Sequence, residues 1–168
     1  MRDHRGGSRG ATSAPLRRLG AVGLVLLAPA VLLVTLWPTH FLLSAKPRVT
    51  RGIEWLRARE LFDWLTWSRL EVLANVGMFV PVALLLTFVA GARRWWIVVA
   101  MCVALSAAIE LVQAFMPGRV AAALDVVANT LGALIGALLA VVVQALVLRF
   151  RARRADRIPS RVAAPDRP

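Results

Sequence analysis

The sequence predicts an all-α, polytopic membrane protein built as a bundle of four transmembrane helices. Hydrophobic residues make up 59% of the 168 residues, above the roughly 45–50% that is typical of soluble domains. They gather into long runs, and the basic residues that produce a formal net charge of +12 flank these runs. A chain this apolar and this strongly charged must separate the two kinds of residue in space.

Four apolar runs are long enough to cross a bilayer. They cover residues 19–37, 72–90, 95–109 and 126–148, and the third continues beyond 109 with only Glu110 and Gln113 as breaks. About 20 residues of helix span roughly 30 Å of hydrocarbon, and a helix satisfies its backbone polar groups within its own segment. Four transmembrane helices are therefore expected.

The segment between the first two runs has a mixed pattern. From 53 to 70, apolar and aromatic residues recur with near-helical spacing, and charged residues fill the gaps. This pattern predicts an interfacial amphipathic helix on the outer surface of the bilayer. An ordinary packed loop fits the same spacing.

The distribution of Lys and Arg predicts the orientation. Fourteen of them flank one side of the four runs, in the N-terminal tail, at 93–94 and from Arg149 onward, whereas seven lie on the other side. Because basic residues collect in the cytoplasm, both termini are expected there. We expect a basic tail at 1–15, a membrane domain at 16–148, and a disordered basic tail at 149–168. Basic residues that flank apolar runs do not form a nucleic-acid-binding surface, so no nucleic-acid partner is expected.

Polar residues inside the predicted spans converge toward one surface. Ser106, Glu110 and Gln113 share one face of the third helix, and Asp125 and Asn129 share a face of the fourth with Gly132 and Gly136. The two glycines form a pair that permits close helix packing. With the helices alternating in direction, the predicted pocket residues all lie within about two turns of the same surface: Asn75, Glu110, Gln113, Asp125 and Asn129, with Arg119 in the loop above them.

Two interpretations of this convergence stay open. The polar side chains can simply hydrogen-bond between helices, or they can form a functional pocket, because ionisable groups are costly in hydrocarbon. Glu110 and Asp125 are the candidate catalytic residues, suited to general acid–base work or cation binding. The two histidines have no helical metal-ligand spacing, so neither a metal nor a cofactor is expected.

At these residues the sequence resembles the VanZ-like family of bacterial integral membrane proteins. Residues 110–136 are similar to its central signature, which runs from Glu110 through Arg119 and Asp125 to Gly136. Residues 75–81 match its asparagine, phenylalanine and proline pattern. The chain departs from the family at Ala122, where many relatives have a second acid, and at Ala83, where a glycine is common. The first departure leaves fewer acids for any mechanism that needs both.

The resemblance implies a multi-pass protein of the bacterial cytoplasmic membrane and an association with teicoplanin resistance. The leading hypothesis is an outward-facing pocket that binds a membrane lipid headgroup or a lipid-linked envelope precursor. The alternatives are a membrane-embedded enzyme acting on a lipid by carboxylate chemistry, and a structural subunit whose partner is a second copy or another membrane protein.

Overall fold

The computed structural model describes residues 14–36, 39–115 and 123–156. The elements in chain order are α1 (Ala14–Leu36), α2 (Thr39–Arg57), α3 (Trp67–Ala90), η1 (Ala92–Arg94), α4 (Trp95–Ala114) and α5 (Ala123–Asp156). No strand occurs within these ranges. Four helices, α1, α3, α4 and α5, are long and apolar enough to cross a membrane. The predicted all-α bundle of four membrane-length helices is confirmed, and the chain is a multi-pass membrane protein.

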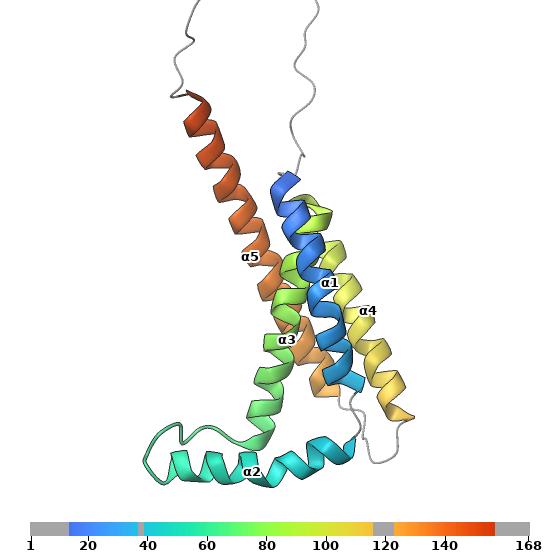
Figure 1. The fold of residues 1–168 in the computed structure, drawn as a ribbon, viewed down its shortest axis with the longest axis vertical. Coiled ribbons are helices and arrows are strands. Elements are labelled where there is room, and N and C mark those ends of the chain that lie inside the picture. Colours follow the sequence, from blue (N-terminus) through green and yellow to red (C-terminus); the bar gives the residue numbers. More distant parts are fainter. Residues whose placement is uncertain (1–13, 37–38, 116–122, 157–168) are drawn as a thin grey trace, which may run out of the picture.

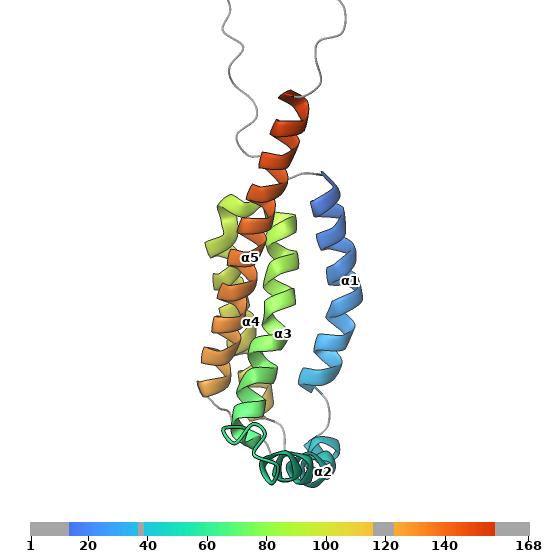
Figure 2. The same cartoon turned by 90° about the vertical axis from the view of Figure 1, so that its left-hand side faces the viewer.

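The four long helices alternate in direction (Figure 1). Helices α3 and α5 run parallel to each other, and α1 and α4 run the opposite way. Helix α2 lies across one end of the bundle, and the same end carries the start of α3, the end of α4 and the start of α5 (Figures 1 and 2). We call this the α2 end. The start of α1, the segment η1 and the last turns of α5 lie at the opposite end.

Helix α3 forms the centre of the bundle and packs most extensively against α5. Small residues make this close approach possible. A Cβ added at Gly132 would lie 2.3 Å from the Val76 carbonyl oxygen, and one at Gly136 would lie 2.1 Å from that of Val80. Only glycine lets the backbones of α3 and α5 approach this closely.

The hydrophobic core lies at the middle depth of α3, α4 and α5. Its largest buried side chain is Phe79, which packs with small or medium residues from the other two helices. The buried cluster consists of Phe79, Val82, Ala83, Val98, Cys102, Ala133 and Ala137. This apolar layer separates the two ends of the bundle.

The helix expected between the first two spans is present, but its bounds differ from the predicted 53–70. Helix α2 ends at Arg57, residues 58–66 turn back, and α3 already begins at Trp67. Glu60 and Phe62 have φ values of 58° and 56°, which no helix contains. The near-helical spacing in the sequence therefore combines a helix end, a turn and a helix start. Thr66 caps α3, because its side-chain oxygen accepts from the Arg69 backbone N–H.

The C-terminal tail also differs from expectation. Helix α5 continues without a break to Asp156, so residues 149–156 are helical and not disordered. Arg149, Arg151, Arg153 and Arg154 are exposed on the part of α5 that extends past the rest of the bundle (Figure 1). Arginine is a good helix former, and a helix that is already nucleated extends at little cost. Residues 1–13 and 157–168 of the expected tails lie outside the described residues.

Candidate functional site

A direct hydrogen bond joins α4 and α5 near the α2 end. The Asn129 side-chain amide donates from Nδ2 to Ser106 Oγ over 2.8 Å. Both side chains are buried, with 5% of Asn129 and none of Ser106 exposed. Because α4 and α5 are antiparallel, this contact determines which residues of the two helices lie at the same level.

The two candidate acids lie one turn beyond this contact. Glu110 follows Ser106 by four residues, and Asp125 precedes Asn129 by four. On antiparallel helices both steps lead toward the α2 end and stay on the same helix face. Glu110 and Asp125 therefore lie at the same level on facing helices, and both are half-buried.

Two amides complete the predicted group at this end. Gln113 lies near the end of α4 and is 7% exposed. Asn75 on α3 is half-buried and precedes Val76, whose carbonyl faces Gly132. Since α3 and α5 are parallel and Asn129 is three residues before Gly132, Asn75 lies within about one turn of the level of Asn129. We call these residues the polar cluster: Asn75, Glu110, Gln113, Asp125 and Asn129.

Arg119 and Ala122 lie outside the described residues, in the segment 116–122 between α4 and α5. Phe115 and Ala123, on either side of that segment, are at the α2 end of the bundle. Glu71, at the start of α3, is exposed, and its carboxylate accepts a hydrogen bond from the Trp67 indole N–H.

Asn129 carries an unusual feature of the cluster. Its Oδ1 atom is buried and has no hydrogen-bond partner among the described residues. Leaving a buried acceptor unpaired costs about 1–3 kcal/mol, so such atoms in native proteins call for an explanation. An ionised carboxylate can only accept, so Glu110 and Asp125 in that form cannot satisfy it. No described residue donates to this oxygen, so it can accept a hydrogen bond from a group outside them.

The chemistry of the cluster follows from its donor and acceptor atoms. Within the ranges 14–36, 39–115 and 123–156, no group of three or more His, Cys, Asp or Glu is placed to hold a metal ion. The cluster offers two carboxylates, which accept hydrogen bonds from N–H or O–H groups when ionised, and three amides, each of which can both accept and donate.

A polar side chain that the sequence patterns did not single out lies at the opposite end of the bundle. Gln144 on α5 is buried; its Nε2 donates to the Thr87 carbonyl over 3.2 Å, and its Oε1 accepts from the Ala92 backbone N–H over 3.2 Å. The expectation that the intramembrane polar residues all lie near one surface is therefore wrong for Gln144. Its position was indicated by the sequence, because Gln144 continues the helical spacing of Ala133, Ala137 and Ala140 and so lies on the same face of α5.

Comparison with family models matches residues 22–144 to the model described as VanZ/LLP1. The match extends from α1 to Gln144 on α5 and includes every residue of the polar cluster. Neither the curated proteins nor the solved structures gave a match.

Proposed function

The chain belongs to the VanZ/LLP1 family, and we propose that its polar cluster binds the headgroup of a membrane lipid or of a lipid-linked cell-envelope precursor. The unpartnered Oδ1 of Asn129, one turn from two carboxylates, carries this proposal. Such a group of acceptors in the end of a membrane bundle favours a ligand that reaches in from the headgroup layer. Headgroups with amine or hydroxyl groups supply the missing donors.

Each residue of the cluster has a role in this proposal. Asn129 Oδ1 accepts from the headgroup, and Glu110 and Asp125 orient its donors or exchange protons with them. Asn75 and Gln113 provide further hydrogen bonds. Arg119, in the segment that joins α4 and α5, contacts the phosphate, because a guanidinium group matches phosphate oxygens in a bidentate fashion.

The ligand is proposed to come from the outer leaflet of the bacterial cytoplasmic membrane. The excess of Lys and Arg at the opposite end of the bundle supports cytoplasmic termini. With this orientation the polar cluster faces the outer leaflet. A protein that sequesters an outer-leaflet envelope precursor would change its availability to a lipid-bearing glycopeptide such as teicoplanin. An altered teicoplanin susceptibility is therefore part of this proposal.

Native mass spectrometry of the purified protein tests the binding. We expect a lipid to copurify with the wild type and its occupancy to fall at least about tenfold in Arg119→Ala and in Glu110→Gln, since a hydrogen bond to a charged group contributes about 1.5–3 kcal/mol. Arg153→Ala removes an exposed arginine at the opposite end and serves as the matched control. Equal lipid occupancy in all four proteins would contradict the proposal.

The shared level of Glu110 and Asp125 favours a second candidate function, an enzyme that acts on a lipid. One carboxyl would act as general base and the other as general acid, a division of roles that two acids in different surroundings can adopt. Turnover of a defined lipid by purified protein, abolished by Asp125→Asn, would support this function. A fixed stoichiometric protein partner that persists without the acids would instead support a structural subunit, with a second copy or another membrane protein as the partner.

A further inference from the structure

Helix α2 and the turn after it extend beyond the bundle as a separate surface. We call residues 44–66 the arm. We propose that the arm binds anionic phospholipid headgroups at the membrane surface. This site is distinct from the polar cluster and does not depend on the function proposed for it.

The arm is attached to the bundle by few contacts. Lys46 Nζ lies 5.3 Å from the centre of the Trp67 ring at the start of α3, and Ile53 is the only buried residue between 44 and 57. Helix α2 runs below the end of the bundle, and its last turns and the turn after them project past α3 (Figure 1). In Figure 2 the same helix is seen almost end-on below the bundle. A helix in this position lies at headgroup depth when the long helices span the bilayer.

The arm carries a net positive charge. Between 44 and 66 there are five basic and three acidic side chains, and every one of them is exposed. The basic residues are Lys46, Arg48, Arg51, Arg57 and Arg59. The excess of Lys and Arg at the opposite end already determines the predicted topology. The five basic residues of the arm lie at the end where that topology disfavours Lys and Arg. Binding to an anionic lipid surface would explain their presence there.

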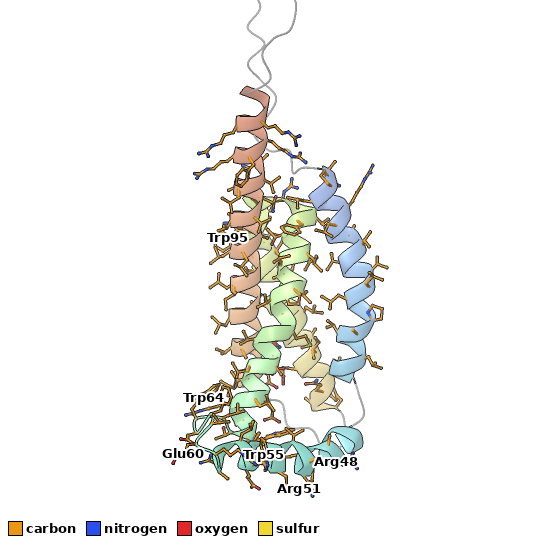
Figure 3. All side chains as sticks on the ribbon, turned by 60° about the vertical axis from the view of Figure 1, so that its left-hand side comes forward. Arg48, Arg51, Trp55, Glu60, Trp64 and Trp95 are labelled. Carbon is orange, nitrogen blue, oxygen red and sulfur yellow. The ribbon has the colours of Figure 1, made fainter. Side chains whose placement is uncertain are left out.

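Aromatic side chains accompany these charges. Trp55, Phe62 and Trp64 are 55%, 54% and 50% exposed. Figure 3 shows Trp64 on the side of the arm nearer the bundle and Arg51 on the far side. The Arg59 guanidinium lies 3.5 Å from the centre of the Trp55 ring. Indole rings prefer the headgroup layer, where their apolar body and their N–H both find partners.

The charge of the arm selects between lipid classes. A basic side chain near an anionic leaflet contributes about 1 kcal/mol, or about fivefold in affinity. A zwitterionic lipid such as phosphatidylcholine has no net charge and gains little from such a surface. The arm is therefore complementary to anionic lipids, and its guanidinium groups can hold a lipid phosphate by paired hydrogen bonds.

A fluorophore on the arm gives a local measurement. Gly52 is exposed, and a Cβ added there meets nothing within 4 Å, so Gly52→Cys is a suitable labelling position. Cys102, the only cysteine, is buried and stays unlabelled. The full-length labelled protein in neutral detergent is titrated with phosphatidylglycerol or with phosphatidylcholine of the same acyl chains. We expect a response to phosphatidylglycerol at lower concentration, and added salt should weaken it.

Variants of two exposed arginines test the role of charge. Arg48→Gln with Arg51→Gln should weaken the phosphatidylglycerol response about 25-fold, from about fivefold per charge, whereas Arg48→Lys with Arg51→Lys should keep most of it. Arg151→Gln with Arg153→Gln makes the same change of charge at the opposite end and should leave the response of the arm unaltered. Asn129→Leu should leave it unaltered too, which separates this site from the polar cluster. A wild-type response in the Arg48→Gln, Arg51→Gln protein, or equal responses to the two lipids, would overturn the proposal.

Discussion

Asn129 on α5 donates to Ser106 on α4 over 2.8 Å, yet the oxygen of the same amide has no partner among the described residues. One half of this side chain thus joins two helices, and the other half is the acceptor that we propose for the lipid headgroup. The two roles can be separated by substitution, because the hydrogen bond with Ser106 involves only Nδ2 of Asn129 and not its Oδ1.

Ser106→Ala should lower stability without removing lipid binding. It deletes the acceptor of one interhelical hydrogen bond, an interaction that averages about 0.6 kcal/mol and reaches about 1.7 in membrane proteins. Asn129→Leu should lose the same bond and also the stabilisation that added lipid gives. The measurement is thermal unfolding in detergent with and without lipid extract. If both variants respond to lipid as the wild type does, the acceptor half of Asn129 has no role in binding.

Gly136→Ala should destabilise the bundle, because the new methyl group would lie 2.1 Å from the Val80 carbonyl oxygen and 3.1 Å from the Leu84 backbone nitrogen. The backbones of α3 and α5 would have to separate, at a cost of about 1–3 kcal/mol. The matched control is Gly77→Ala on α3, where an added Cβ meets nothing within 4 Å. That change should be neutral or stabilise by up to about 1 kcal/mol, since alanine is the better helix former. Unfolding temperatures that fall equally in both variants would contradict the close packing of α3 and α5.

Hydropathy predicts the four long helices because the bilayer requires continuous apolar runs of a known length. It does not predict α2, which contains Pro47 and Gly52, two poor helix formers, and which has no apolar run. The extension of α5 to Asp156 was missed for a related reason. Its arginines interrupt the hydropathy pattern although they favour a helix.

The site was predictable only in part. The four-residue spacing from Ser106 to Glu110 and from Asp125 to Asn129, with alternating helix directions, is enough to place both acids toward one end. Which side chains meet depends on how each helix is rotated about its axis. For α5, the close approach of Gly132 and Gly136 to the α3 backbone helps to set this rotation. That approach depends on tertiary packing, which the spacing of residues in the sequence does not specify.

Gln144→Leu should weaken the opposite end of the bundle and leave the α2 end unchanged. The substitution removes the acceptor of the Ala92 backbone N–H and a donor to the Thr87 carbonyl. The Thr87 carbonyl still accepts from the Gly91 N–H at 2.8 Å. The main effect is therefore the unpaired Ala92 N–H, which lowers stability by about 1–3 kcal/mol. Hydrogen exchange should show faster opening at 91–94 in the variant, with lipid occupancy equal to that of the wild type. Loss of bound lipid in Gln144→Leu would mean that this end takes part in binding.

The predicted orientation can be tested with single cysteines on opposite sides of the bundle. Gly52 on α2 and Arg153 near the end of α5 are both exposed and lie at opposite ends, whereas the native Cys102 is only 1% exposed and gives little background. With both termini in the cytoplasm, a membrane-impermeant thiol reagent should label Gly52→Cys in intact cells, after permeabilisation of any outer membrane. Arg153→Cys should be labelled only once the inner membrane is opened. The reverse pattern would place the polar cluster and the arm on the cytoplasmic side, and a ligand from the outer leaflet would then be excluded.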